Sequence, residues 1–192
     1  MKKLILVGGG GHCKSCIDVI EQTGEYEIAG VLDIPEKIGQ KVLGYEITGS
    51  DEDIEKYAKR DVYFLITLGQ IESADLRKKL FETIKKSGGK FATVISPRAY
   101  VSKYSKIGEG TIVMHDALVN AGAEIGKNCI LNTKCLVEHD CVVEDNVHIA
   151  VGAVLSGGVK VSAESFIGTN STVVQYKEIA PKSFVKAGML YK

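Results

Sequence analysis

The second half of the chain places an aliphatic residue at every sixth position, from Ile95 to Val185. A second column, four residues after each of these anchors, holds mostly small side chains, including Cys129, Cys135 and Cys141. Residues two apart on a strand point to the same side, so the two columns predict a narrow interior filled by small and branched side chains. A period of six is typical of a parallel β-helix built from hexapeptides. The anchors are Ile95, Val101, Ile107, Val113, Val119, Ile125, Leu131, Val137, Val143, Ile149, Leu155, Val161, Ile167, Val173, Ile179 and Val185.

Glycines between an anchor and the following small residue predict corners, because glycine adopts tight backbone conformations without steric cost. Three hexapeptides make one triangular coil, so the run predicts about five coils. These corner glycines are Gly108, Gly110, Gly122, Gly126, Gly152, Gly157, Gly158 and Gly168.

Residues 1–94 follow a different pattern, in which short apolar runs alternate with helical ones. A helix that ends at Gly24, a second that begins at Ser50 and a third that begins at Ser73 are expected between the strands. Leu76, Leu80 and Ile84 are expected on the buried face of the third helix. Strands alternating with helices predict a parallel sheet, so we expect an α/β half-Rossmann domain over 1–94 and a parallel β-helix over 95–192. The predicted strands are Leu4–Val7, Ile28–Leu32, Val62–Leu68 and Phe91–Ile95.

A run of four glycines, from Gly8 to Gly11, follows the first predicted strand and precedes His12. Such a turn lets the backbone approach a diphosphate, and the N-terminus of the following helix supplies N–H donors. Asp33, at the end of the second strand, can accept hydrogen bonds from a ribose or a base. The third glycine of a dinucleotide fingerprint would fall on Cys13 or Lys14. A mononucleotide or nucleotide-sugar site is therefore favoured over an NAD site, with a plain tight turn as the alternative.

Composition excludes some partners. The formal net charge is zero, 45% of the residues are hydrophobic and 25% are charged. No basic stripe predicts nucleic-acid binding, and no apolar run is long enough to predict a membrane span. Five cysteines is an odd number, and three of them fall in the inward small column. They are expected to be buried reduced thiols of a cytoplasmic protein.

The β-helix contains three histidines, His115, His139 and His148, and none falls in an inward column. His115 and His139 fall at corners, whereas His148 points outward from a flat face, so each is expected on the solvated surface. Glu138 and Asp140 flank His139, and a neighbouring carboxylate can orient an imidazole and raise its basicity. The intervals between the histidines are 24 and 9 residues, unlike the two histidines five positions apart in β-helical carbonic anhydrases. No metal site is expected.

Several segments resemble the bacterial hexapeptide-repeat nucleotide-sugar acetyltransferases, which include UDP-N-acetylbacillosamine N-acetyltransferases and sialic acid O-acetyltransferases. The resemblance also covers the glycine turn and Asp33, and implies a left-handed β-helix that uses acetyl-CoA. It further implies a homotrimer with the active site between adjacent β-helices. The matching segments in the second half are Asn120-Ala121-Gly122-Ala123, Ile130-Leu131-Asn132-Thr133, Val137-Glu138-His139-Asp140 and Val147-His148-Ile149-Ala150-Val151-Gly152-Ala153.

The same resemblance implies residue roles. His139 would be the general base, and Asp140 would tune it. The residues that would line the acetyl-CoA site are His148, Thr169, Ala187 and Gly188. The residues that would bind the nucleotide-linked substrate are Gly10, Gly11, His12, Asp33, Gly69 and Asn132.

We therefore expect an acetyl-CoA-dependent N-acetyltransferase that acts on a nucleotide-linked amino sugar by direct transfer. Acetylation of a sialic acid hydroxyl is an alternative, because a hydroxyl acceptor needs the same base. A nucleotide-sugar-binding protein without catalysis is a second alternative, which the intact triplet around His139 argues against. Ile34 stands where the family often has a second acid, and Gln70-Ile71 replace its Asn-Asn pair. The identity of the nucleotide and of the sugar stays open.

Overall fold

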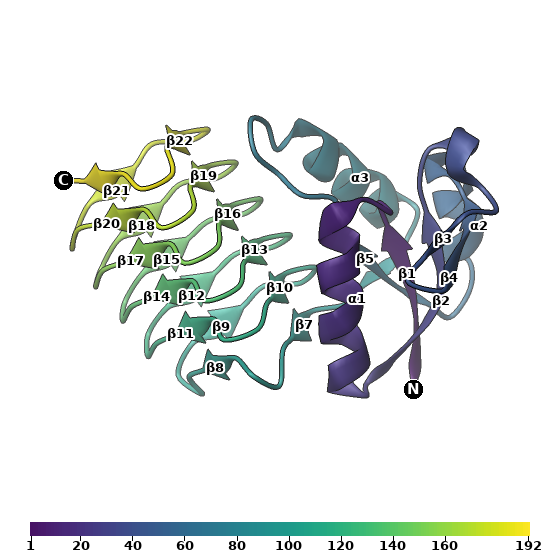
Figure 1. The fold of residues 1–192 in the computed structure, drawn as a ribbon, viewed down its shortest axis with the longest axis horizontal. Coiled ribbons are helices and arrows are strands. Elements are labelled where there is room, and N and C mark those ends of the chain that lie inside the picture. The colour runs from purple at the N-terminus through teal and green to yellow at the C-terminus, as the bar shows by residue number, and fades with distance from the viewer.

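The computed structural model describes residues 1–192 as two units that lie side by side (Figure 1). The N-terminal unit contains a six-stranded sheet in the order β3-β4-β2-β1-β5-β6. Its strands pair in parallel except for the antiparallel hairpin of β3 and β4, which the sequence did not predict. The strands are β1 (Lys2–Val7), β2 (Tyr26–Leu32), β3 (Lys41–Val42), β4 (Tyr45–Gly49), β5 (Tyr63–Ile66) and β6 (Lys90–Phe91).

Three α-helices connect these strands: α1 (Gly11–Thr23), α2 (Ile54–Ala58) and α3 (Asp75–Lys86). Two short 3-10 turns, η1 (Pro35–Lys37) and η2 (Asp51–Asp53), precede β3 and α2. Gly24 ends α1 in the left-handed conformation, with φ of 64°. Ser50 starts η2 with a capping box to Asp53. These two predicted helix boundaries are therefore confirmed. The third is wrong by one residue, because α3 has Ala74 as its N-cap and the Ser73 hydroxyl accepts a hydrogen bond from the Asp75 N–H just before it.

The predicted buried face of α3 is wrong at its first residue. Leu76 is 54% exposed, whereas Arg77 is 2% exposed and lies with Leu80 and Ile84 on the inner face. Both patterns satisfy helical spacing, because Arg77 is three residues before Leu80 and Leu76 is four before it. Residue type alone favours the apolar Leu76 for the buried face, but the structure buries the charged Arg77 there.

The C-terminal unit is a left-handed β-helix of three parallel sheets with two-residue strands (Figure 1). Each strand pairs with the strand one coil away, eighteen residues along the chain, as Leu136 pairs with Val154. The first sheet is formed by β7 (Val94–Ile95), β10 (Ile112–Val113), β13 (Ile130–Leu131), β16 (His148–Ile149), β19 (Phe166–Ile167) and β22 (Phe184–Val185). The second is formed by β8 (Tyr100–Val101), β11 (Leu118–Val119), β14 (Leu136–Val137), β17 (Val154–Leu155), β20 (Thr172–Val173) and β23 (Leu190–Tyr191). The third is formed by β9 (Lys106–Ile107), β12 (Glu124–Ile125), β15 (Val142–Val143), β18 (Lys160–Val161) and β21 (Glu178–Ile179).

The chain turns three corners in each coil: a first corner from sheet one to sheet two, a second from sheet two to sheet three, and a third back to sheet one. The third residue after an anchor adopts a positive φ at these corners, as Gly122 (76°) and Asp140 (58°) do. Glycine suits this position, and asparagine or aspartate tolerates it. Thirteen of the sixteen anchors and every small residue from Ala117 to Val159 join one buried core cluster of 21 residues, which confirms the two-column prediction.

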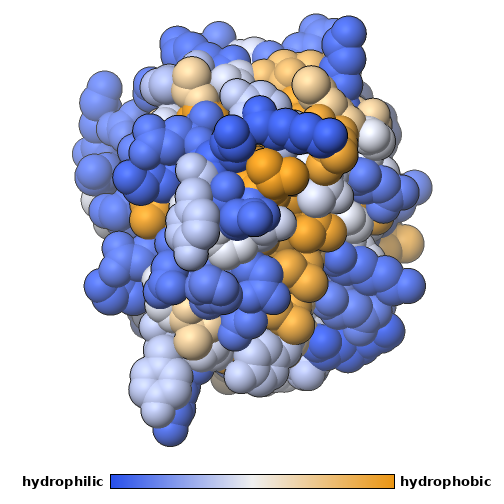
Figure 2. Space-filling view, turned by 90° about the vertical axis from the view of Figure 1, so that its left-hand side faces the viewer, coloured by the Kyte–Doolittle hydropathy of each residue, from blue (hydrophilic) through white to orange (hydrophobic).

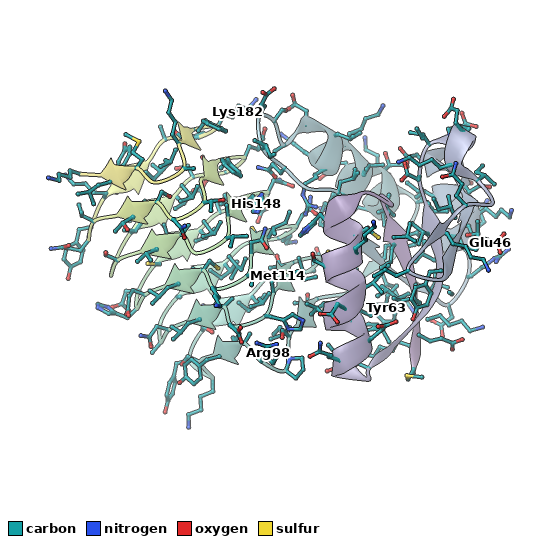
Figure 3. The ribbon with its side chains drawn as sticks, in the orientation of Figure 1. Glu46, Tyr63, Arg98, Met114, His148 and Lys182 are labelled. Carbon is teal, nitrogen blue, oxygen red and sulfur yellow. The ribbon has the colours of Figure 1, made fainter.

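The two units share a hydrophobic core. Helix α1 packs between its own sheet and sheet one of the β-helix, where Ile112, Met114 and Ile130 join the same 18-residue cluster as Cys16 and Ile20. Figure 3 shows Met114 and His148 on the side of the β-helix that faces α1. Sheet one is therefore covered over much of its length, which leaves sheets two and three as the open faces. None of the helices is sufficiently long and apolar to cross a membrane.

Candidate active site

The glycine turn lies at the carboxyl edge of the N-terminal sheet, directly after β1. Gly8 has φ of 106°, and a Cβ there would lie 3.0 Å from the backbone nitrogen of Leu68, so only glycine fits. Gly10 and Gly11 have no atoms within 4 Å of a Cβ position. Helix α1 begins here without a side-chain cap and without acidic residues in its first turn. Its N–H groups therefore face open space beside Gly10, which suits an anionic ligand.

Asp33 closes the glycine turn from the end of β2. Its Oδ2 accepts hydrogen bonds from the Gly9 N–H at 2.7 Å and from Lys37 Nζ at 3.0 Å. Its Oδ1 accepts one from the Ile34 N–H at 2.7 Å. Burial acts to raise the pKa of the Asp33 carboxyl, but the bonds from Ile34, Lys37 and Gly9 outweigh it and hold that pKa below its ordinary value. Asp33 is therefore an ionised carboxylate that fixes the shape of the turn.

His12 lies in the first turn of α1 and faces the β-helix. Its Nε2 is buried without a hydrogen-bond partner, and its Cβ lies 3.8 Å from where a Cβ of Gly69 would be. The ring centroids of His12 and His148 are 6.4 Å apart. Burial and the nearby Arg77 charge lower the pKa of His12 to about 3. The His12 ring is therefore neutral, with one nitrogen free for a further partner.

His148 points outward from sheet one, as predicted, but it is not solvated. It is only 6% exposed, because the N-terminal unit covers this part of sheet one. Its Nδ1–H donates to the Gln70 carbonyl at 2.6 Å, and its Nε2 accepts from Asn132 Nδ2 at 3.1 Å. Burial lowers the pKa of His148 to about 4. His148 is thus a neutral link between the loop after β5 and the first corner of the β-helix.

His115 is also not the solvated histidine that the sequence predicted. Its Nε2 lies 2.8 Å from the Asp18 carboxylate on α1, and its Nδ1 lies 2.7 Å from Ser96 Oγ. Only 13% of its side chain is exposed. Docking of the N-terminal unit against the β-helix accounts for the burial of both histidines, and six-residue periodicity gives no information about that docking.

Arg77 is a buried residue of this region that the sequence did not indicate. Its guanidinium donates to the carbonyls of Ile66 at 3.0 Å and Leu68 at 2.6 Å, at the end of β5. It also donates to the Asn128 carbonyl at 3.0 Å and to Asn128 Oδ1 at 2.8 Å on the β-helix. Arg77 therefore joins the carboxyl edge of the sheet to the β-helix, beside His12.

His139 and Asp140 lie at a second corner, between β14 and β15. The His139 Nδ1–H donates to Asp140 Oδ2 at 2.9 Å, and the His139 side chain is 53% exposed. Glu138 Oε2 accepts from the His139 backbone N–H at 3.0 Å and from Asn120 Nδ2 at 2.9 Å, which fixes the corner. The hydrogen bond to Asp140 raises the pKa of His139 above its ordinary value. Because Nδ1 is engaged, Nε2 is the atom that can accept a proton.

The remaining predicted residues lie on the line of first corners. Thr169 and Ala187 are exposed and one coil apart, and the Gly188 N–H donates to the Thr169 carbonyl at 2.8 Å. Asn132 lies at a first corner two coils before Thr169. The structure thus gathers Gly10, Gly11, His12, Asp33 and Gly69 at the sheet edge, and His148 and Asn132 connect this group to the first corners. His139 and Asp140 stand apart, on the other side of sheet two, and the three histidines of the β-helix form no common metal-ligand group.

The burial of His148 predicts a pH-dependent stability. Its imidazole is neutral in the fold but protonates in the unfolded chain below about pH 6.5, so acidification favours unfolding. Between pH 7 and pH 5 the His148 shift to a pKa of about 4 should remove about 2 kcal/mol of unfolding free energy. Urea denaturation at the two pH values should show that the unfolding free energy of His148→Gln falls by about 2 kcal/mol less than that of the wild type. His139→Gln is the control and should retain it; an unchanged dependence in His148→Gln would contradict the prediction.

Comparison with known proteins agrees with this architecture. Residues 3–84 match the family model of the PglD N-terminal domain. A UDP-N-acetylbacillosamine N-acetyltransferase of Bacillus subtilis is 37% identical over 117 residues, which cover 59% of this chain and 52% of that protein. The aligned part of the chain thus spans about half the length of this relative.

Two solved structures superpose on nearly the whole chain. The acetyltransferase domain of PglB from Neisseria gonorrhoeae has a TM-score of 0.91 at 30% identity, covering 98% of this chain and 90% of that one. That domain has also been solved in complex with acetyl coenzyme A. A mutant perosamine N-acetyltransferase from Caulobacter crescentus, in complex with CoA and GDP-perosamine, has a TM-score of 0.90 at 29% identity, covering 98% and 87%.

A glycine turn on a Rossmann-like sheet, joined to a left-handed β-helix with a histidine–carboxylate pair at a corner, defines a hexapeptide-repeat acyltransferase. Within this class, the superposition on nearly all of the PglB acetyltransferase domain indicates an acetyltransferase. The chain belongs to the family of hexapeptide-repeat nucleotide-sugar acetyltransferases.

Proposed function

We propose that the protein is an acetyl-CoA-dependent N-acetyltransferase that acts on the amino group of a nucleotide-linked amino-deoxysugar. The observation that carries this proposal is the His139–Asp140 pair, exposed at a corner with Nε2 free. Relatives described as UDP-N-acetylbacillosamine and GDP-perosamine N-acetyltransferases support the substrate class. We place the enzyme in the cytoplasm, because five free cysteines suit a reducing compartment.

The first corners suit the coenzyme. Thr169 and Ala187 are exposed there, and their backbone N–H groups make no hydrogen bond within the chain. An extended chain of amides, such as the pantetheine arm of acetyl-CoA, can use N–H groups presented in this way. Gly188 has open space around its Cβ position. His148 lies further along the same side, towards the nucleotide site, where the thioester would be placed.

The nucleotide would occupy the sheet edge. Its diphosphate fits the open N-terminus of α1 at Gly10 and Gly11, and the free Nε2 of His12 provides a further polar contact. Gly69 forms the opposite wall, and Asn132 continues the path towards the first corners. Asp33 supports the turn by accepting hydrogen bonds from the Gly9 and Ile34 N–H groups.

Sheet two supports a homotrimer. The side chains that point outward from sheet two, here called its outward column, are almost entirely apolar and only partly buried. Sheet three instead carries the ion pairs Lys106–Glu124 and Lys160–Glu178 on its outer side. Figure 2 shows an apolar band running along this side of the β-helix beside a polar surface. Burial of such a face against two copies of the chain would remove it from water. The outward column of sheet two is Tyr100, Leu118, Leu136, Val154, Thr172 and Leu190.

The same packing would complete the active site. Within one chain, sheet two separates His139 from the first corners and from the nucleotide site. Packing sheet two against a neighbour would bring the second corner of one subunit to the first corner of the next. The amino sugar held by one subunit would then meet His139 of the other. This arrangement gives direct transfer in a ternary complex.

In the reaction, the sugar amine attacks the thioester carbonyl while His139 Nε2 takes the amine proton. Backbone N–H groups at the corners would stabilise the oxyanion. Cleavage of the carbon–sulfur bond would then release CoA, whose sulfur takes the proton held by His139 and leaves as the thiol. No acyl-enzyme is needed. Cys129, Cys135 and Cys141 are at most 1% exposed, and burial raises their pKa values, so none is an available thiolate.

The proposal is tested by acetyl-CoA turnover, read as free thiol, against a panel of nucleotide-linked amino sugars and sialic acids. We expect turnover with an amino sugar nucleotide and an amide-linked acetyl group in the product. Turnover with sialic acids alone would establish the O-acetyltransferase alternative. Binding of nucleotide sugars without turnover across the panel would establish a non-catalytic binding protein.

Gly10→Val should separate the two substrates. The side chain would fill the open space beside the α1 N-terminus, so the KM for the nucleotide sugar should rise about tenfold or more, equivalent to about 1.4 kcal/mol of lost binding. The acetyl-CoA KM should stay nearly unchanged, because the first corners are remote from Gly10. Initial-rate kinetics with each substrate varied in turn measures both values. A rise in the acetyl-CoA KM instead would show that the glycine turn is misassigned.

A further inference from the structure

Gly157 lies one coil after His139 on the line of second corners, and the imidazole rests against it. A Cβ at Gly157 would lie 2.6 Å from His139 Nε2 and 2.7 Å from Cε1. Carbon atoms in contact sit about 3.5–4.0 Å apart, so any side chain at Gly157 would overlap the ring. The contact involves the nitrogen that must accept the proton.

The backbone does not require glycine at this position. Gly157 is absent from the residues with positive φ, whereas its neighbour Gly158 has φ of 68°. Gly157 is the second residue after its anchor, and the equivalent second positions elsewhere in the β-helix carry ordinary side chains. Among the sixteen anchors only Leu155 is followed by glycine at this place, and the other occupants include Ala121, Val151, Ala163, Thr169 and Ala187. The His139 ring is thus the obstacle to a side chain.

The ring has few other constraints. The His139 backbone is fixed by its N–H bond to Glu138 and by the Gly158 N–H, which donates to its carbonyl at 2.9 Å. The side chain itself makes one hydrogen bond, from Nδ1–H to Asp140, and half of its surface is open. The absence of a side chain at Gly157 therefore allows the ring to keep the orientation in which its Nδ1–H donates to Asp140.

We propose that Gly157 is a positioning residue, whose missing side chain lets the His139 imidazole lie against the next coil while it is hydrogen-bonded to Asp140. This inference rests on the proposed role of His139 as the general base. Gly122, on the coil before, lies in the same way against Asp140. Its φ of 76° already requires glycine, so Gly157 is the position at which the steric role can be tested alone.

The test is Gly157→Ala, with Ala163→Ser as the matched control at the same place of a third corner. NMR titration of labelled histidine should show the His139 pKa, which Asp140 raises, falling towards the ordinary value in Gly157→Ala. Asp140→Asn should produce a similar fall, and the double variant should add little to it. Ala163→Ser should leave the titration unchanged. An unchanged His139 pKa in Gly157→Ala would overturn the proposal.

Kinetics supplies the second measurement. Misplacement of a reacting group by about 1 Å can cost on the order of 10²-fold in rate, so kcat of Gly157→Ala should fall by about that factor with the melting temperature retained. The NMR result does not depend on activity. A lowered pKa in Gly157→Ala together with an active His139→Ala would reject the base and keep the positioning role.

A measurement on the unchanged protein keeps the proposal testable if the variant does not fold. The Gly157 α protons should show a ring-current shift and nuclear Overhauser contacts to the His139 ring, and both should be lost in His139→Ala. Their absence from the wild-type spectrum would show that the ring does not rest on Gly157.

Discussion

Replacement of His139 by alanine should lower kcat/KM by about 10²–10⁴-fold, the range typical for loss of a general base. The side chain is 53% exposed and fills no core space, so the melting temperature should hardly change. Steady-state kinetics combined with thermal denaturation separates the two effects. Activity within threefold of wild type at neutral pH would reject His139 as the base and leave the corner triplet as ordinary surface charge.

The pH profile gives the same experiment a second measurement. In the proposed mechanism transfer requires the neutral imidazole of His139. Because Asp140 raises the pKa of His139, kcat/KM should rise with pH through a midpoint above the ordinary histidine value of about 6.5. Asp140→Asn should move this midpoint to lower pH and cost less rate than His139→Ala. This rise of kcat/KM with pH should disappear in His139→Ala.

Periodicity predicted the β-helix well because each coil repeats the same local geometry. The anchors from Val113 to Val185 are all buried, and each strand meets the strand eighteen residues away. Residues eighteen positions apart therefore also lie on the same line of corners. His139 and Gly157 are eighteen residues apart, so the sequence alone could have indicated their contact.

Docking between the two units could not be predicted in this way. His148 and His115 were expected in solvent, but both lie against the N-terminal unit. His115 contacts Asp18 of α1, and His148 contacts Gln70 in the loop after β5. The outward columns of sheets one and two are both mainly apolar, so the sequence pattern does not say which of the two the N-terminal unit covers. Arg77 shows the same limit: its buried guanidinium depends on carbonyls of β5 and of Asn128, which come together only after docking.

The contacts of the candidate site could be predicted best where its residues are adjacent in sequence. His139 and Asp140 are neighbours, and their hydrogen bond is present. His148 and Asn132 were expected in separate roles, on acetyl-CoA and on the substrate, whereas the structure joins them at 3.1 Å. Residues from distant segments need the fold before their partners can be named.

Mixing two variants that are each impaired at limiting nucleotide sugar should restore activity if the site lies between subunits. His139→Ala damages only the second corner, and Gly10→Val only the nucleotide site. In mixed trimers a complete site needs an intact Gly10 from one subunit and an intact His139 from its neighbour. Random assembly at equal amounts should therefore complete about one quarter of the sites. Each variant alone, at saturating acetyl-CoA and limiting nucleotide sugar, contributes only its small residual rate.

The experiment requires co-expression of the two variants with different affinity tags and sequential purification on both. Assemblies that carry both tags should then show activity well above the sum of the separately purified variants. Each variant co-expressed with a differently tagged copy of itself is the control for tagging and purification. Because His139 and Gly10 lie on opposite sides of sheet two within one chain, no rearrangement inside a subunit could supply the missing half. Doubly tagged assemblies that remain inactive would show that each subunit acts alone, and recovery of single-subunit particles by sedimentation would lead to the same conclusion.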